Sequence, residues 1–281
     1  MSRLKKALEK AKKDFSNIQP YSTEKQKPPE YENLEQKSIF RAETNIDFSR
    51  TKIQPVSHDV LRNNKIFALI SNYSVNNQIK TLRTQVLKEL KKIGSNTMMV
   101  TSANPGEGKT FTSINLGVSI AQEMDRTVLI VDADLKNPAK DHYDFASDFF
   151  SINVEKGLAD VLLGNIELDA ALINPGIKKL TILPGGNYQH TSAELIGSPQ
   201  MELLVNDVKK RYKDRIVIFD TPAILACADP IQLAKFVECV LFVVEEEKTK
   251  TEDIRQAMKL LSDSRMVGMI LNKSKSKSKS K

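Results

Sequence analysis

Short, almost entirely apolar runs recur along the chain after residue 96. They lie at Thr97–Thr101, Thr127–Asp132, Leu180–Leu183, Ile216–Asp220, Cys239–Val244 and Val267–Leu271. A strand with one solvent-facing side alternates apolar and polar residues, whereas a strand covered on both faces is apolar at nearly every position. Longer segments with helical signals separate the runs. The pattern therefore predicts an α/β fold, in which a parallel β-sheet is covered by helices on both faces.

The segments outside the runs carry signals of helix starts. Ser198 precedes Pro199, so a capping hydroxyl stands before a proline at the first helical position. Thr249 and Glu252 have the spacing of a capping box. Upstream of the first run, apolar residues recur at every third or fourth position, and we expect a helix over Val75–Leu90.

The first 60 residues have a different pattern. Residues 1–15 predict a short amphipathic helix with lysines on its polar faces. Such a helix could make peripheral contact with an anionic membrane or dock on a partner, and a solvated, frayed helix is the simpler interpretation. Residues 16–60 are polar and contain four prolines, so we expect a flexible arm or linker. A globular domain is then expected over residues 61–272, followed by a disordered Lys/Ser tail over residues 273–281.

Composition and charge narrow the function classes. The net charge is +7, but residues 273–281 carry five lysines and no acid, which leaves about +2 for the rest of the chain. A lysine tail without aromatic residues does not indicate specific nucleic-acid binding. Two cysteines without a CxxC pair and three scattered histidines do not predict a zinc site. Because we find no apolar run of about 18 residues and no signal peptide, we expect a cytoplasmic chain that could contact the inner face of the plasma membrane.

The most specific motif follows the first apolar run. Residues 103–110 read ANPGEGKT, and an apolar-striped helix is expected after them. A strand, a glycine-rich loop and a helix in this order make a phosphate loop, or P-loop, in which backbone N–H groups and the helix N-terminus bind phosphate oxygens. Ala103 stands where the strict motif has glycine, and both residues are small. The predicted nucleotide-binding residues are Asn104, Pro105, Gly106, Glu107, Gly108, Lys109, Thr110 and Phe111.

Acidic residues follow two of the other runs. Asp132 and Asp134 come at the end of the second run, and Asp220 ends the fourth. The carboxyl ends of parallel strands meet at one edge of the sheet, where ligands of such sheets bind. We therefore expect these carboxylates in one crevice with Lys109, where a cation such as Mg²⁺ would offset their burial. The alternative for each aspartate is a turn or a helix N-cap. Asn272, which closes the last run, could contact adenine or only make a strand-end turn.

The motifs SANPGEGKT, LIVDADLKNP and IVIFDTP resemble those of the bacterial tyrosine kinases, the tyrosine autokinases of polysaccharide systems. The runs EMDRTVLIVDADLKNP, GLADVLLG and DRIVIFDTPAILACADP are most similar to the type encoded with exopolysaccharide and exosortase (PEP-CTERM sorting) loci. The similarity spans about residues 60–272 and implies a P-loop fold of the MinD/ParA class. In the partitioning branch of that class the loop begins with an extra lysine, so Asn104 at this position favours the kinase branch.

The resemblance also implies cofactors and residue roles. ATP and Mg²⁺ are the expected cofactors. Lys109, Asp132 and Asp134 would be catalytic, with Asp132 drawing the proton of the acceptor tyrosine or fixing the metal. Thr110, Asp132 and Asp220 would hold Mg²⁺. Lys136 stands where the family usually has arginine, which keeps the charge and loses the bidentate fork.

Two family features are reduced in this sequence. The family's oligomerisation helix reads roughly ExxRxxR, and the matching stretch Asn77–Arg83 retains only Arg83. Many members end in a cluster of tyrosines, whereas this chain ends in serines and lysines. Tyr21 and Tyr31 in the arm are therefore the first candidate phosphoacceptors, and ordinary linker tyrosines are the alternative.

Two functional hypotheses follow from these observations. The first is a protein-tyrosine (auto)kinase that regulates exopolysaccharide biosynthesis or export, acting beside a separate membrane chain-length-determinant protein that activates it. The second is a MinD/ParA-like ATPase switch that dimerises on ATP and binds a membrane or protein partner without phosphorylating protein. The basic first helix and the missing tyrosine tail favour the switch, while the motif set favours the kinase. A homo-oligomer fits either hypothesis.

Overall fold

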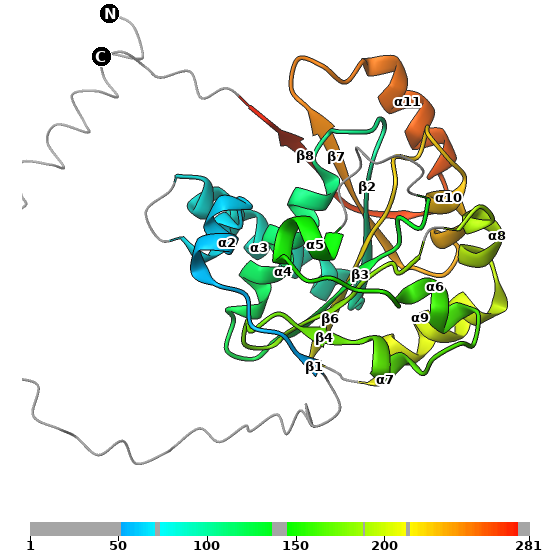
Figure 1. The fold of residues 1–281 in the computed structure, drawn as a ribbon. Helices are drawn as coiled ribbons and strands as arrows, with labels where there is room; N and C mark the ends of the chain where they lie inside the picture. The colour runs from blue at the N-terminus through cyan, green and yellow to red at the C-terminus, as the bar shows by residue number, and fades with distance from the viewer. Residues whose placement is uncertain (1–51, 71–73, 137–144, 188, 212–213, 275–281) are drawn as a thin grey trace, which may run out of the picture. The chain divides into compact units, whose positions relative to one another are not determined.

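One mixed sheet with the strand order β1-β4-β5-β3-β6-β2-β7-β8 runs through the described part of the chain. The computed structural model of the protein describes residues 52–70, 74–136, 145–187, 189–211 and 214–274 (Figure 1). The strands are β1 (Lys52–Ile53), β2 (Thr97–Ser102), β3 (Thr127–Asp132), β4 (Ile173–Asn174), β5 (Leu180–Leu183), β6 (Arg215–Asp220), β7 (Cys239–Glu245) and β8 (Arg265–Asn272). Neighbouring strands are parallel except β4 and β5, so the predicted parallel sheet is confirmed apart from that pair.

Helices cover both faces of this sheet, as Figure 1 shows. One face packs against α2 (His58–Asn63), the 3-10 helix η1 (Phe67–Leu69), α3 (Ser74–Ile93), α4 (Lys109–Ala121) and α5 (Phe145–Phe150). The other packs against α6 (Leu158–Leu162), α7 (Leu168–Ala171), α8 (Ser192–Ile196), α9 (Pro199–Arg211), α10 (Asp229–Leu233) and α11 (Thr251–Leu260). In β2, Met98 and Val100 enter the first core and Met99 enters the second. Apolar runs without alternation thus serve two hydrophobic cores, as predicted.

The edge strand β8 departs from this pattern. Its apolar sequence predicted burial on both faces, but Met269 is 51% and Leu271 is 57% exposed. The reason is topological, because β8 pairs only with β7 among the described strands and lies at the end of the sheet. An apolar run therefore indicates a strand here but does not show whether that strand is central.

The domain begins earlier than the sequence indicated. Residues 52–60, which the predicted arm included, contain β1 and the start of α2. Amide side chains hold the irregular backbone that follows: the Asn115 Nδ2 donates to the carbonyl of Lys65 at 3.2 Å, and its Oδ1 accepts from the Ala68 N–H at 3.1 Å. The buried Asn76 Nδ2 donates to the carbonyl of Ile70 at 2.8 Å. Side-chain amides of α3 and α4 thus satisfy backbone groups of the segment that joins α2 to α3.

The local helix signals have mixed outcomes. The helix expected over Val75–Leu90 is α3, and Ser198 caps α9 by accepting from the Met201 N–H at 3.3 Å. The capping box at Thr249 is wrong, because α11 begins at Thr251 after Lys250 as its N-cap. The Thr249 hydroxyl donates to Glu107 instead, at 2.6 Å. The predicted helix 1–15 and most of the 273–281 tail lie outside the described residues.

Replacing Asn76 with alanine is expected to lower the free energy of unfolding by about 1–3 kcal/mol. The carbonyl of Ile70 would lose the side-chain donor that binds it at 2.8 Å. The carbonyls of Phe67 and Ala68 would each lose one of two donors. Urea denaturation measures the change. Asn77→Ala is the matched control, since Asn77 is an exposed neighbour on the same helix. Equal stability of the two variants would contradict the anchoring role of Asn76.

Candidate functional site

Three neighbouring strands bring the predicted site residues to one edge of the sheet. The loop after β2 leads into α4, whose first residues are Lys109 and Thr110. Asp132 ends β3 and Asp220 ends β6, and these two residues are direct register partners. Because β6 lies between β3 and β2, the two aspartates and the loop share the carboxyl edge. The expected crevice therefore has its structural basis in the strand order.

Three carbonyls of the loop, those of Gly106, Glu107 and Gly108, accept hydrogen bonds from other parts of the chain. The Lys273 Nζ donates to the carbonyl of Gly106 at 2.7 Å, and the Asn272 Nδ2 donates to the carbonyl of Glu107 at 2.9 Å. The carbonyl of Gly108 accepts from the backbone of α4 in the ordinary helical manner. Within the described chain, the backbone N–H groups of Gly106, Glu107 and Gly108 donate to no residue. Free donors beside a helix N-terminus form an anion-binding site.

Two glycines allow this conformation. Gly106 has φ +80° and Gly108 has φ +96°, both in the left-handed region that side chains disfavour. At Gly108 a Cβ atom would also lie 2.0 Å from the Asn272 Nδ2. Both positions therefore need glycine for its positive φ, and position 108 also needs it to leave room for Asn272.

The side chains of Asn104 and Glu107 point to the β7–α11 region. The Asn104 Nδ2 donates to the Asp253 Oδ2 at 2.9 Å, and the Glu107 Oε1 accepts from the Thr249 hydroxyl at 2.6 Å. Glu107 is only 1% exposed. These two predicted nucleotide-binding residues are therefore placed to contribute backbone groups, while their side chains fix the loop to its neighbour.

Asp220 is a buried carboxylate beside the loop. Its Oδ1 accepts from the Ser113 hydroxyl at 2.8 Å. Burial raises the pKa of Asp220 to about 6, while Lys109, Thr110 and Ser113 act in the opposite direction. Asp134 lies close enough to raise the same pKa through its charge. The carboxylates thus gather as predicted, and a cation would relieve the cost of ionising Asp220.

The carboxylate of Asp132 is oriented by two backbone groups. Its Oδ1 accepts from the Asp134 N–H at 3.1 Å, and its Oδ2 accepts from the Gly185 N–H at 3.3 Å. A Cβ atom on Gly185 would stand 3.0 Å from the same oxygen. The loop after β5 therefore approaches Asp132 closely and fixes its direction.

Several of these contacts have no signal in the sequence. Ser113 and Gly185 stand outside any recognised motif, and Lys273 was assigned to the tail. Asp229 was also not predicted: it is 1% exposed, and neither carboxylate oxygen has a partner among the described residues. Only Asn272 was singled out, because it closes a strand that reaches the same edge. The candidate phosphoacceptors Tyr21 and Tyr31 lie outside the described residues.

The chain is similar in sequence to a known domain family and to known bacterial proteins. Residues 95–268 match the AAA domain family. Over 210 residues the chain is 34% identical to the tyrosine-protein kinase YwqD of Bacillus subtilis, which covers 74% of this chain and 85% of that protein.

The chain belongs to the bacterial tyrosine-protein kinase family.

Other bacterial tyrosine kinases share the same domain. The chain is 29% identical to the Escherichia coli tyrosine-protein kinase Etk over 196 residues, which are 69% of this chain but 26% of Etk. The solved kinase domain of that enzyme superposes with a TM-score of 0.67 at 26% identity, covering 79% of this chain and 88% of the domain. The chain therefore corresponds to the kinase domain of a much longer relative. MinD of Pyrococcus horikoshii, solved with Mg-ADP, has a TM-score of 0.51 at 25% identity over 63% of this chain and 69% of that one.

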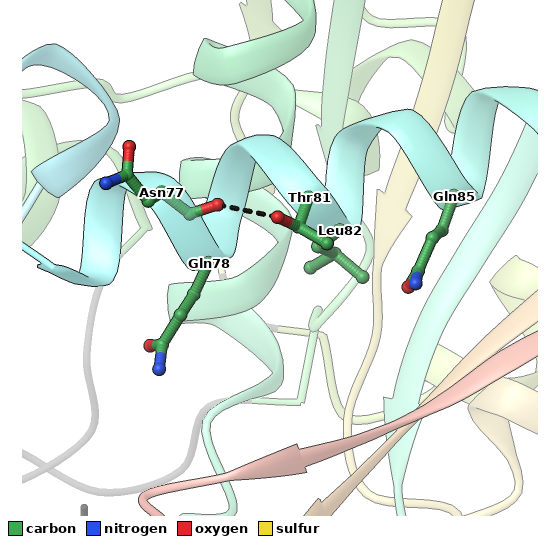
Figure 2. Close-up of a pocket in the computed structure, with 5 residues that line it drawn as sticks. All are labelled: Asn77, Gln78, Thr81, Leu82 and Gln85. Atoms are coloured by element: carbon green, nitrogen blue, oxygen red, sulfur yellow. Dashed lines mark hydrogen bonds between the residues drawn. The ribbon is translucent and has the colours of Figure 1, made fainter. Parts of the chain in front are cut away.

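This kinase-family domain has a further pocket of about 340 Å³ along α3, apart from the nucleotide site. Figure 2 shows its lining residues Asn77, Gln78, Thr81, Leu82 and Gln85. Arg83, the retained residue of the oligomerisation pattern, is used within the chain: it donates to the carbonyl of Ser119 at 3.0 Å and pairs with Glu123 at 2.7 Å. Arg83 thus ties α3 to α4. In the described ranges, no helix has the length and apolar character needed to cross a bilayer.

The raised pKa of Asp220 predicts a pH dependence for the metal-free protein. Between about pH 4 and 6 the folded state binds more protons than the unfolded chain, so the carboxyl lowers stability as the pH rises through this window. Asp220→Asn should therefore raise the free energy of unfolding at pH 7.5 by roughly 1–3 kcal/mol, with a smaller gain at pH 5. Urea denaturation at both pH values tests this.

Asp263→Asn serves as the control, because it removes one negative charge from an exposed position. A gain for Asp220→Asn that is no larger than that of the control at pH 7.5 would contradict the assignment of a destabilising buried carboxylate.

Proposed function

We propose that the chain is an ATP- and Mg²⁺-dependent protein-tyrosine kinase that phosphorylates itself or a second copy and regulates exopolysaccharide biosynthesis or export. The observation that carries this proposal is the juxtaposition of a phosphate loop with free N–H groups and an oriented carboxylate, Asp132. Phosphoryl transfer depends mainly on positioning and on neutralising charge, which this arrangement supplies. The polysaccharide role rests on the motif resemblance, including its narrower likeness to the exosortase-locus type.

The residues present fit a magnesium ion. Asp220 is buried beside Lys109 and the Thr110 hydroxyl, and Asp132 is its neighbour in register. Thr110, Asp132 and Asp220 offer hard oxygen ligands of the kind Mg²⁺ prefers. When bound together with ATP, the ion would neutralise charge on the β- and γ-phosphates.

In this mechanism the chain's own groups bind, orient and move a proton. The N–H groups of the loop and the Lys109 ammonium hold the β- and γ-phosphates. Asp132 accepts the proton of the acceptor tyrosine as its oxygen bonds to the γ-phosphorus, and the bond from that phosphorus to the bridging oxygen breaks to release ADP. Asp134 places its N–H against Asp132 and adds a second carboxylate to the site.

The contacts of Asn104 favour the kinase over the ATPase switch. In the switch proteins an extra lysine occupies this position, whereas here the carboxamide is bound to Asp253 within the same chain. The likeness to MinD keeps the switch as the second candidate. The activating partner of the kinase would be a separate membrane chain-length-determinant protein, and the kinase would then act at the inner face of the membrane, with residues 1–15 as a further contact.

Incubation of the full chain with ATP and Mg²⁺, with and without a candidate activator segment, is expected to produce phosphotyrosine that mass spectrometry can map. Tyr21 and Tyr31 are the first positions to examine. Lys109→Met should abolish the signal, because the loop then lacks the cation for the β- and γ-phosphates.

Asp132→Asn should lower phosphotyrosine formation about a hundredfold or more, because it removes the proton acceptor. Binding of ATP through the loop and Lys109 should weaken much less than that. Asp125→Asn, at an exposed position, is the matched control. Slow ATP hydrolysis without phosphotyrosine under all conditions would support the switch and contradict the kinase.

A further inference from the structure

We propose that Asn272 and Lys273, at the end of β8, are positioning residues that hold the phosphate loop in its phosphate-binding conformation. The inference rests on the proposed nucleotide binding but not on phosphoryl transfer to tyrosine. Both residues reach the loop from the far end of the sequence, 165 and 167 positions away from the carbonyls that they bind.

The planarity of the peptide bond explains why these contacts matter. In a trans peptide the C=O and the following N–H point in opposite directions. Lys273 holds the carbonyl of Gly106 outward, which turns the N–H of Glu107 inward. Asn272 does the same for the carbonyl of Glu107 and the N–H of Gly108. The hydrogen bonds from Lys273 and Asn272 therefore orient two N–H groups of the loop, those of Glu107 and Gly108, towards the phosphate.

The loop needs such an external constraint. The glycines on either side of these peptides are free to change φ, so a peptide could rotate and present its carbonyl to the phosphate instead. An inward carbonyl would repel an anion and remove a donor at the same time. Asn272 fills the space that a side chain at position 108 would occupy, so it is packed against the peptide that it holds.

Lys273 is itself held in place by an acidic partner. Its ammonium lies 3.0 Å from the Glu245 Oε2 at the end of β7. Lys273 also has φ +57°, an uncommon conformation for a residue with a side chain. Charge-assisted bonds to a carboxylate and a carbonyl identify Lys273 as part of the loop's support and not as the first residue of a free tail.

The chain provides a matched control for this lysine. Lys248 pairs with the same oxygen of Glu245, at 3.2 Å, and is 63% exposed. Among the described residues, Lys248 has no bond to the loop. Removing either ammonium takes one cation from Glu245, but only Lys273 also donates a hydrogen bond to the carbonyl of Gly106.

The experiment compares Lys273→Met with Lys248→Met by calorimetric titration of the full chain with ATP and Mg²⁺. Lys273→Met should weaken binding about tenfold, and Lys248→Met should change it less than about twofold. Lys273→Arg, which keeps a cationic donor, should recover most of the affinity. Asn272→Ala should weaken binding to a similar extent as Lys273→Met, while the melting temperatures without nucleotide stay close to the wild type.

Kinetic constants separate positioning from chemistry. For Lys273→Met the KM for ATP should rise, because the loop of the variant must be ordered when ATP binds. The kcat at saturating ATP should change little, because the loop is ordered once ATP is bound. Wild-type affinity in Lys273→Met, or an equal loss in Lys248→Met, would overturn the inference while leaving the nucleotide site in place. Failure of the wild-type chain to bind ATP would instead contradict the proposed function.

Discussion

The orientation of a few peptide planes in the loop after β2 is the constraint on which the site depends. A phosphate loop works only if its N–H groups converge and its carbonyls face away, towards other hydrogen-bond donors. Here the donors are Asn272 at the end of β8, Lys273 directly after it, and the backbone of α4, which follows the loop. The edge strand β8, which is half exposed and could appear dispensable, is thereby joined to the centre of the site.

The carboxylates of the site favour a cation, whereas the N–H groups of the loop favour an anion. The same edge of the sheet that exposes N–H groups to an anion also concentrates Asp132, Asp134 and Asp220. Burial makes the ionised form of Asp220 unfavourable in the absence of a cation. The site is therefore electrostatically complete only when an anion and a cation arrive together, as they do in a metal–nucleotide complex. Binding of such a complex would restore the stability that the free protein loses through the ionised Asp220.

The sequence allowed the central part of this structure to be predicted. Buried strands, the phosphate loop and the strand-end aspartates have patterns that arise from local chemistry, so Lys109, Asp132 and Asp220 could be named and brought together. The remaining contacts depend on the tertiary fold. Thr249 has the spacing of a capping residue, yet its hydroxyl binds Glu107, 142 positions away in the sequence. Lys273 belongs to a low-complexity tail by composition and to the loop by contact.

The hydrophobic pattern of the sequence also does not predict whether a strand lies at the edge or in the centre of the sheet. The run that became β8 reads as a central strand, and β1 and β4 are too short to give any periodicity. Asn76 and Asn115 would be ordinary polar helix residues if they did not face a backbone segment that needs their amides. The support of the site is therefore less predictable than the site itself, because supporting residues are chosen by what they meet in space.

The most direct test of this account is calorimetric titration of the wild-type chain with ATP, ADP and AMP, each with and without Mg²⁺. A loop built around the β- and γ-phosphates and an acidic edge built for a cation should bind ATP and ADP more tightly with Mg²⁺ and AMP weakly under both conditions. Binding of AMP as tight as that of ATP, with no effect of Mg²⁺, would contradict it.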